Sequence, residues 1–307
     1  MDSSSILLTG ATGQVGSQLL RTLAKLGTIV APSRTEMDLS QPDAVRKVIR
    51  NVKPRWIVNP GAYTAVDRAE SEPELAFAVN AATVGAIGEE AQRLGAGVIH
   101  FSTDYVFSGS GTEPHKEGDA PDPVSVYGAS KLAGEQALMA SGAAHLIFRT
   151  SWVYGATGKN FLLTIVKLAR EREEIRIVAD QHGAPTWSGD LAMMTAAVIM
   201  RCEASVAEEQ PIADAVTPLN GVYHAAGAGE TTWYGLASEA INRVREREPG
   251  VRFAKLLAIS TAAYPTPAKR PENSRLDCSK LLHTFGWALP EWRQSLRTVI
   301  GDLTLYR

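Results

Sequence analysis

The chain has 307 residues, of which 45% are hydrophobic and 21% are charged, with 31 Lys and Arg against 33 Asp and Glu. A chain of this length buries roughly 75% of the surface that its unfolded form exposes, so it can build a large core without disulfides. The formal net charge of -2 excludes the basic excess with which proteins neutralise nucleic-acid phosphates. Small molecules are therefore the expected partners.

Cysteine content and hydropathy bear on the cellular compartment. Cys202 and Cys278 are the only cysteines, which excludes a disulfide framework and favours a reducing cytosol. No apolar run approaches the ~20 residues that span a bilayer, and the first five residues are too few and too polar for a signal peptide. We therefore expect a cytoplasmic globular protein with no membrane partner and no nucleic-acid partner.

Short apolar runs alternate with segments of helical periodicity in the N-terminal half. Strands are predicted over 6–9, 28–31, 56–59, 98–102 and 146–150, and helices over 14–26, 43–52, 73–94 and 126–140. This alternation is typical of βαβ units around a parallel sheet. The predicted fold class is α/β, a doubly wound parallel sheet of the Rossmann type.

Beyond residue 150 the alternation is less regular. Helices are predicted over 160–171 and 190–201, and a strand over 222–225. The stretch 203–220 is rich in Ala, Glu and Pro and predicts an exposed loop or insertion, and prolines at 265, 267 and 271 mark an extended segment before two short helices. We predict a Rossmann domain over 1–150 and a smaller C-terminal substrate-binding lobe over 151–307, with some segments returning to the first domain.

Three glycines follow the first predicted strand. Gly10, Gly13 and Gly16 have the spacing G-x-x-G-x-x-G, and glycine both permits positive φ and lacks the Cβ that would block a pyrophosphate. The N-terminus of the next helix offers free N–H groups and a positive dipole end to such an anion. Glycines in such turns can serve packing alone, but the position at the first βα turn favours a dinucleotide site.

The residues after the second predicted strand indicate which dinucleotide is bound. An acidic residue there would hold the ribose diol of NAD, whereas an arginine accommodates the 2′-phosphate of NADP. Arg34, preceded by Ser33, stands in that place, so we favour NADPH and keep NADH as the alternative. Arg34 as a solvated surface residue is the competing interpretation, and Glu36 close by supports it.

Tyr127 and Lys131 lie four residues apart in the helix predicted over 126–140, so they share one face of it. A phenol has an unperturbed pKa of ~10, and an adjacent ammonium favours the phenolate and lowers that pKa toward neutrality. Such a pair is common on exposed helices. Here it follows the polar cluster that begins at Ser102, at the end of a buried strand, where open α/β sheets bind ligands.

The glycine turn, the hydroxyl residue that closes the fourth strand and the Tyr-x-x-x-Lys pair together resemble the extended short-chain dehydrogenase/reductase family. Longer strings are similar to those of the dTDP-4-dehydrorhamnose reductases within it. They are Thr12-Gly-Gln-Val-Gly16, Ala62-Tyr-Thr-Ala-Val-Asp67, Ala69-Glu-Ser-Glu-Pro73, Ser102-Thr-Asp-Tyr-Val-Phe107, Phe148-Arg-Thr-Ser-Trp-Val-Tyr154, Asp180-Gln-His-Gly-Ala-Pro-Thr186, Thr231-Thr-Trp-Tyr234 and Arg270-Pro-Glu-Asn-Ser-Arg-Leu276.

The resemblance implies hydride transfer from NAD(P)H to the C4 ketone of dTDP-4-dehydro-L-rhamnose. Tyr127 would donate a proton to the forming alkoxide, Lys131 would lower its pKa and hold the nicotinamide ribose, and Thr103 would hydrogen-bond the carbonyl oxygen. Beside Gly10 and Arg34, the implied cofactor contacts are Gly13, Gln14, Val15, Asp38, Leu39, Ala62, Tyr63 and Thr64. Beside Thr103, the implied substrate contacts are Asp104, Trp152, Gln181, Gly183, Arg270, Asn273 and Arg275.

Several readings stay open at this point. Arg270 and Arg275 either bind the ligand diphosphate or form structural salt bridges, and Trp187, Trp233, Trp287 and Trp292 are expected to pack rather than to bind. His100 and His182 receive no catalytic role.

The sequence also leaves alternatives for the oligomeric state and for the activity of the protein. Gln18 and Gly189 stand where some relatives carry glutamates that bind magnesium at a dimer interface, so we expect no metal and either a monomer or a homodimer. The alternative activities are another nucleotide-sugar reductase or epimerase, and a non-catalytic regulatory subunit like the relatives that accompany methionine adenosyltransferase.

Overall fold

The computed structural model describes residues 5–207 and 210–305. Its central sheet has six strands in the order β10-β5-β4-β3-β1-β2, and every pairing in it is parallel. The strands are β1 (Ile6–Leu8), β2 (Ile29–Val30), β3 (Trp56–Asn59), β4 (Gly97–Thr103), β5 (Ala144–Thr150) and β10 (Gly221–His224). The predicted doubly wound parallel sheet is confirmed.

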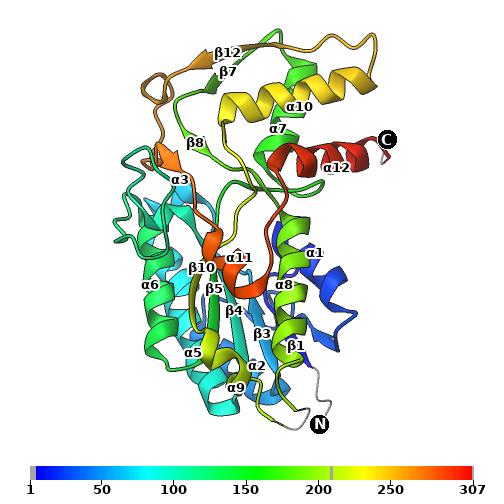
Figure 1. Ribbon diagram of the computed structural model, residues 1–307. Helices are drawn as coiled ribbons and strands as arrows, with labels where there is room; N and C mark the ends of the chain where they lie inside the picture. Colours follow the sequence, from blue (N-terminus) through cyan, green and yellow to red (C-terminus); the bar gives the residue numbers. More distant parts are fainter. Residues whose placement is uncertain (1–4, 208–209, 306–307) are drawn as a thin grey trace.

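Helices cover both faces of this sheet (Figure 1). One face carries α1 (Gln14–Leu23) and α8 (Ser188–Glu203), and the other carries α2 (Pro42–Val52), α5 (Thr83–Leu94) and α6 (Val126–Ala140). Each face of the sheet has its own hydrophobic core: the first core lies between the sheet and α1 and α8, and the second lies between the sheet and α2, α5 and α6. Side chains alternate across a strand, so Ile6 and Leu8 of β1 enter the first core and Leu7 enters the second. The two apolar faces of the sheet explain why its strands read as continuous hydrophobic runs.

The helix predicted over 73–94 is interrupted by a wider turn. It consists of α4 (Pro73–Phe77), the π-helical turn η1 (Ala78–Ala82) and α5, and a short helix α3 (Val66–Ala69) precedes it. Single π-helical turns inside α-helices occur frequently at functional sites. Asn80 lies in this turn and is fully buried.

The upper part of the molecule in Figure 1 is built from the second half of the chain. Its helices are α7 (Phe161–Glu171), α10 (Trp233–Arg247) and α12 (Trp292–Leu305). Helices α7 and α10 pack beside the parallel pair β7 (Glu174–Val178) and β12 (Lys255–Ile259), and α12 packs against α10. Asn160 and Thr232 cap α7 and α10 with their side-chain oxygens. The sequence predicted α7 but neither strand, because both are short and partly exposed.

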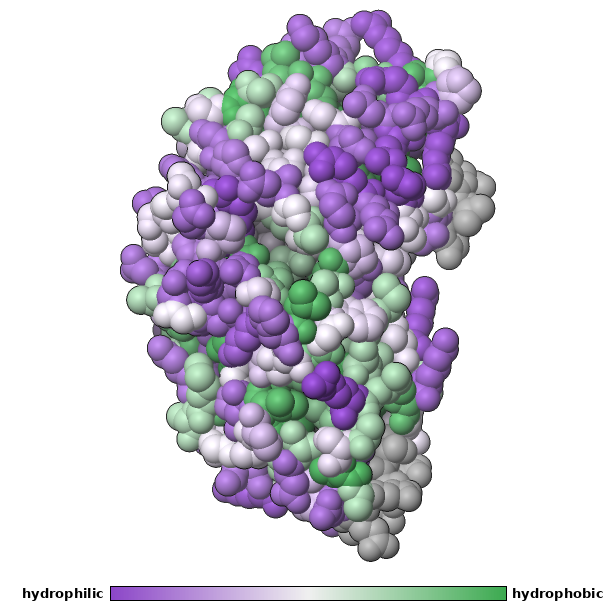
Figure 2. Space-filling view, in the orientation of Figure 1, coloured by the Kyte–Doolittle hydropathy of each residue, from purple (hydrophilic) through white to green (hydrophobic). Residues whose placement is uncertain are grey.

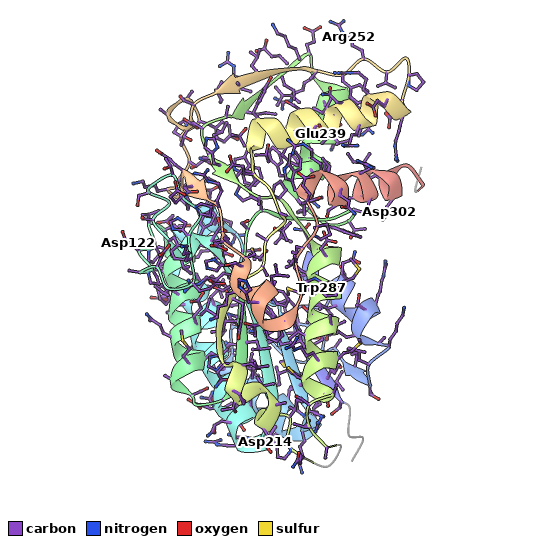
Figure 3. The ribbon with its side chains drawn as sticks, viewed as in Figure 1. Asp122, Asp214, Glu239, Arg252, Trp287 and Asp302 are labelled. Carbon is purple, nitrogen blue, oxygen red and sulfur yellow. The ribbon has the colours of Figure 1, made fainter. Side chains whose placement is uncertain are left out.

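Smaller elements connect the upper part to the sheet. The strands β8 (His182–Gly183), β11 (Thr231–Thr232) and β13 (Asn273–Ser274) form a three-stranded sheet, and β6 (Val153–Tyr154) pairs with β9 (Thr186–Trp187). Helix α11 (Ser279–Phe285) and the short turns η2 (Asp104–Val106) and η4 (Thr261–Ala263) complete this region. Trp287, labelled in Figure 3, follows α11 and packs against the first core. Of the two C-terminal helices, α12 is longer than predicted.

The stretch 203–220 differs from the predicted exposed loop. It contains α9 (Ala213–Val216) and η3 (Thr217–Leu219), and Ile212 and Val216 are fully buried in the first core. The Glu203 carboxylate accepts hydrogen bonds from Arg55 and from the Trp56 indole. A single helical turn is too short to show a hydrophobic period, which explains the error; residues 208 and 209 lie outside the described residues.

Membrane insertion finds no candidate segment. Among the described helices, none combines the length and the apolarity that crossing a bilayer requires.

Candidate active site

The glycine turn lies between β1 and α1, and a different structural requirement favours glycine at each of its three positions. Gly10 has φ +54, and a Cβ there would lie 2.7 Å from Gly61 Cα, whereas a Cβ on Gly16 would lie 2.0 Å from the Gly10 oxygen. Gly13 is the N-cap residue of α1 and offers no side chain to cap it. The amides of the first turn therefore stay open to an anion, which fits a pyrophosphate.

Two predicted cofactor residues of α1 contact other parts of the chain. The Val15 side chain packs against the first core, so only its backbone faces the turn. The Gln14 side chain accepts a hydrogen bond from Asn160 at 2.9 Å and lies 3.4 Å from the Val153 oxygen. Gln14 thereby joins the glycine turn to the upper part of the molecule.

The segment after β2 presents Arg34 to solvent, and among the described residues none forms a hydrogen bond or ion pair with its guanidinium. Glu36 does not pair with it either: its carboxylate accepts from the Ser33 amide at 2.7 Å and the Ser33 hydroxyl at 2.8 Å. Asp38 accepts from both the amide and the hydroxyl of Ser40, and these bonds lower the pKa of its carboxyl. Arg34 is thus available to a phosphate, and Asp38 is held as an anion.

Strand β3 leads into the loop that carries Ala62, Tyr63 and Thr64. Asn80 fixes this loop, because its side chain accepts from the Tyr63 amide at 2.8 Å and donates to the Tyr63 oxygen at 3.0 Å. The same side chain donates to the Ser130 hydroxyl on α6 at 3.0 Å. Sequence reasoning missed Asn80, although an asparagine inside an alanine-rich helix was a visible signal.

Leu39 meets the same loop from the other side. A Cβ on Gly61 would lie 2.5 Å from Leu39 Cδ1 and 2.8 Å from Thr9 Oγ1, so only glycine fits between them. The Thr83 hydroxyl donates to the Leu39 oxygen at 2.6 Å. Leu39, Ala62 and Tyr63 therefore flank the crevice beside β1 and β3, where the strand order reverses and open α/β sheets bind ligands. Thr64 is exposed next to them.

Helix α6 brings Tyr127 against the end of β4. Ser125 caps the helix by accepting from the Gly128 amide at 3.2 Å, and a Cβ on Gly128 would lie 2.1 Å from the Tyr105 oxygen. Burial raises the pKa of Tyr127 to about 12, against a hydrogen bond with the Thr103 hydroxyl that lowers it. The predicted lowering of the Tyr127 pKa by Lys131 is wrong for this structure, because the Lys131 amine is directed to the Phe101 oxygen and His100. Tyr127 is therefore held as a protonated phenol, the form that donates a proton.

The Lys131 side chain points toward β4 rather than toward the tyrosine. It is 2% exposed, and its Nζ lies 2.6 Å from the Phe101 oxygen and 3.3 Å from His100 Nε2. Burial lowers the pKa of Lys131 to about 8, partly opposed by Glu135. Glu135 itself is buried with Arg149, whose Nη2 lies 2.6 Å from it.

Asp104 follows Thr103 at the end of β4. Its Oδ1 accepts from the Thr103 hydroxyl at 3.0 Å, while its buried Oδ2 has no partner with hydrogen-bonding geometry among the described residues. Burial raises the pKa of Asp104 to about 6, although the hydroxyls of Ser274 and Thr103 oppose that rise. A buried carboxyl with a free oxygen is a group that a bound hydroxyl can satisfy.

Trp152, Gln181 and Gly183 meet around Trp233. The indoles of Trp152 and Trp233 stack with centroids 3.8 Å apart, and a Cβ on Gly183 would lie 2.7 Å from Trp152 Cε2. Gln181 accepts from the Trp233 indole at 3.1 Å and donates to the Thr261 hydroxyl at 3.1 Å. Trp233, predicted to pack only, therefore supports a predicted substrate residue; the one signal in the sequence was its place in the string Thr231-Thr-Trp-Tyr234 that resembles the family.

The segment around β13 carries the remaining predicted substrate residues. Arg275 is fully engaged, with Nε on Asn273 Oδ1, Nη1 2.8 Å from Glu230 and Nη2 on the Thr112 oxygen. Asn273 donates to the Glu113 oxygen. Arg270 places Nη2 2.8 Å from Asp67, which leaves part of its guanidinium uncommitted.

Two groups of predicted residues are thus joined at one cleft. Ser274 of β13 lies near Asp104, and β13 pairs with β8, which carries Gly183 against Trp152. The surface is hollowed between the sheet and the upper part, and Figure 2 shows weakly polar to hydrophobic residues in that hollow. The arrangement offers an anion site at α1, a Thr-Tyr-Lys set in which Thr103 and Lys131 are buried and Tyr127 is partly exposed, and an aromatic platform.

Comparisons with known proteins agree along almost the whole chain. The family described as the RmlD substrate binding domain matches residues 4–305. A dTDP-4-dehydrorhamnose reductase of Escherichia coli K12 is 46% identical over 303 residues, covering 97% of this chain and 98% of the relative. One from Burkholderia thailandensis is 45% identical, with 97% and 98% covered.

A solved structure has the same fold. It is the dTDP-4-dehydrorhamnose reductase of Bacillus anthracis in complex with NADP, which superposes with a TM-score of 0.87 at 33% identity, covering 98% of this chain and all of that one.

Proposed function

The chain belongs to the family of the RmlD substrate binding domain, and from this premise we propose that it reduces the C4 ketone of dTDP-4-dehydro-L-rhamnose with NADPH. The observation that carries the proposal is the hydrogen bond between Tyr127 and Thr103 at the end of β4, with the buried Lys131 one turn further along α6. The similar reductases named above support the substrate, and the NADP complex of the Bacillus anthracis enzyme supports the cofactor.

The residues present fit a dinucleotide. The uncapped N-terminus of α1 would hold the pyrophosphate, Arg34 would hold the 2′-phosphate, and Asp38, Leu39, Ala62, Tyr63 and Thr64 would flank the adenosine and its ribose. Bound NADPH supplies the hydride. In this proposal residues 1–150 hold the dinucleotide and residues 151–307 hold most of the sugar nucleotide.

Side chains of the protein would supply the proton and stabilise the negative charge that forms on the C4 oxygen. Tyr127 is held protonated and would donate its proton to the C4 oxygen as negative charge forms there. Thr103 would donate a hydrogen bond to the same oxygen, which stabilises the developing charge. Lys131 would supply positive charge next to the phenol and hold the nicotinamide ribose, which requires its Nζ to leave the Phe101 oxygen.

The sugar nucleotide would lie across the cleft. Asp104 Oδ2 is free to accept from a sugar hydroxyl, and Trp152 with Gly183 and Gln181 would contact the ring. Arg270 is the better placed arginine for the diphosphate, because Arg275 is occupied by Glu230, Asn273 and Thr112; Asn273 and Arg275 would then shape the site.

We also propose that the enzyme works in the cytoplasm, as a monomer or a homodimer that does not depend on a metal. The two free thiols support the compartment, and the non-acidic Gln18 and Gly189 support association without magnesium. Light scattering with and without a chelator would test the second statement.

The decisive experiment follows NADPH oxidation by the purified chain across several 4-keto nucleotide sugars. We expect turnover with dTDP-4-dehydro-L-rhamnose, and a loss of about 10²- to 10⁴-fold in kcat for Tyr127→Phe. Tyr234→Phe is the matched control: Tyr234 packs against the buried cluster of the upper part that contains Ile165, Ile177 and Ile241, and this variant keeps wild-type turnover. Sugar interconversion without net NADPH oxidation would show an epimerase instead, and full turnover in Tyr127→Phe would exclude this proton donor.

A further inference from the structure

A chain of four buried polar side chains runs beneath the active site. Thr9 Oγ1 lies 2.5 Å from Asn59 Oδ1, Asn59 Nδ2 lies 3.0 Å from His100 Nδ1, and His100 Nε2 lies 3.3 Å from Lys131 Nζ. All four side chains are at most 2% exposed. The chain crosses the carboxyl ends of β1 and β3, continues through β4 and reaches α6, so it links the glycine turn to the catalytic lysine.

His100 is the unexpected member, because it interrupts an apolar strand. Its neighbours Ile99 and Phe101 enter the first core, whereas His100 points to the face that carries α6. A buried polar side chain costs stability unless it is hydrogen-bonded, and an apolar residue would fill this place without that cost. Both ring nitrogens are partnered by Asn59 and Lys131, which gives the imidazole a defined use.

The partners fix which ring nitrogen carries the proton. A neutral imidazole has one donor and one acceptor nitrogen. When Lys131 is an ammonium, Nε2 must accept, so Nδ1 carries the proton and Asn59 must turn its amide oxygen toward it. When Lys131 is a neutral amine, Nε2 can donate to it, and Asn59 then donates to Nδ1 while accepting from Thr9. The orientation of Asn59 is therefore tied to the charge of Lys131.

We propose that His100 is a positioning residue that holds the Lys131 amine and couples its protonation to Asn59 and Thr9 at the glycine turn. The inference rests on the proposed function for its kinetic effect, though not for the coupling itself. The titratable groups that act on this pair are Glu135 on α6, which acts on Lys131 and is already paired with Arg149, and His145 on β5, which acts on His100. Burial, reinforced by the Lys131 charge, holds the pKa of His100 well below its ordinary value, so the ring stays neutral.

Two substitutions separate the two ring contacts. The amide of His100→Gln can reach the position of Nε2 and keep the Lys131 contact, whereas His100→Asn keeps only the Asn59 contact. We expect His100→Gln to retain kcat within about threefold, and His100→Asn to lose about tenfold or more in kcat with the KM for the sugar nucleotide unchanged. The alkaline limb of the pH profile also moves in His100→Asn. Equal losses in the two variants, or wild-type kcat and pH profile in both, overturn the proposal.

A second measurement uses the wild-type protein and does not depend on activity or on the folding of the His100 variants. Ring ¹⁵N resonances distinguish a protonated from an unprotonated nitrogen of His100. Between pH about 6 and about 10 we expect its two nitrogens to exchange roles without the ring becoming charged, and the step to vanish in Lys131→Met. A pH-independent tautomer in the wild-type protein, or a step that persists in Lys131→Met, overturns the coupling. Absence of reductase activity beside an intact ¹⁵N step would refute the proposed function alone.

Discussion

The indole rings of Trp152 and Trp233 lie nearly parallel, with centroids 3.8 Å apart and planes 14° from one another. Trp152 has φ +46, a left-handed conformation that costs of order 1–3 kcal/mol for a non-glycine residue. Stacking on Trp233, together with the close approach of Gly183, stabilises that conformation. Trp233 is in turn oriented by Gln181, whose amide donates to the Thr261 hydroxyl, and that hydroxyl donates to Asp180. The aromatic platform proposed to contact the sugar is therefore assembled from four distant segments of the chain.

Loss of the stack should weaken sugar binding selectively. We expect Trp233→Leu to raise KM for the sugar nucleotide about tenfold or more with KM for NADPH unchanged, because Trp152 loses its support. Trp233→Phe, which keeps a ring, should show a smaller rise. Steady-state kinetics of both variants, with Trp287→Leu at the labelled position of Figure 3 as the control for a lost indole, checks this. An unchanged KM for the sugar nucleotide in Trp233→Leu would show that the stacked indoles do not contribute to sugar binding.

The alkaline limb of activity should follow Lys131 rather than Tyr127. The pKa of Lys131 is lowered to about 8 by burial, so its positive charge is lost as pH rises through that value, whereas the pKa of Tyr127 is raised to about 12 and the phenol stays protonated. We expect kcat/KM to fall above pH about 8. The arginine in Lys131→Arg keeps its positive charge at all these pH values. This variant should therefore show no fall of kcat/KM above pH about 8, although its activity is lower than that of the wild-type protein. A profile flat to pH about 10 would contradict this assignment.

Cofactor choice should depend on Arg34. Loss of a charged contact with phosphate costs roughly 1.5–3 kcal/mol, so Arg34→Ala should raise KM for NADPH about 10- to 100-fold. KM for NADH should stay nearly constant, because NADH lacks the 2′-phosphate. Arg252→Ala, an exposed arginine of the upper part labelled in Figure 3, is the control. Equal changes of KM for both dinucleotides would show that Arg34 is a solvated surface residue and does not bind the 2′-phosphate.

Asp104 should lower the stability of the protein when it is ionised. Its pKa is raised from 3.8 to about 6 by burial, so the folded state binds more protons than the unfolded state between these values and stability falls as pH rises through them. Above pH 6 the penalty is complete, at most about 3 kcal/mol. Asp104→Asn should therefore raise Tm by a few °C at pH 7 and by less at pH 4.

The matched control for Asp104 is Asp122→Asn, which changes an exposed aspartate labelled in Figure 3 and should leave Tm unaltered. Differential scanning calorimetry of the two variants decides the matter. A lower Tm for Asp104→Asn at pH 7 would mean that the carboxylate is better solvated than its burial indicates.

Local patterns were enough to predict the sheet and the first binding element. Apolar runs bounded by turns predicted every strand of the sheet, because a strand buried on both faces shows as a continuous hydrophobic run. The positive φ expected of this turn is found at Gly10, whereas Gly16 is required by packing against the Gly10 backbone, the other role that such glycines can have. The strands β7 and β12 were not predicted because they are short and partly exposed. Helix α9 was not predicted because a single helical turn is too short to show a hydrophobic period.

The sequence by itself determined the doubly wound sheet, the glycine turn and the candidate chemistry of Thr103, Tyr127 and Lys131, since each depends on residues near one another in the chain. Tertiary structure alone decided which groups face Lys131, that Asn80 joins two loops, that Trp233 supports Trp152, and that Arg275 is already occupied. Such contacts join residues tens to hundreds of positions apart. Local periodicity carries no information about them, because burial and hydrogen-bond pairing are set by the packed fold.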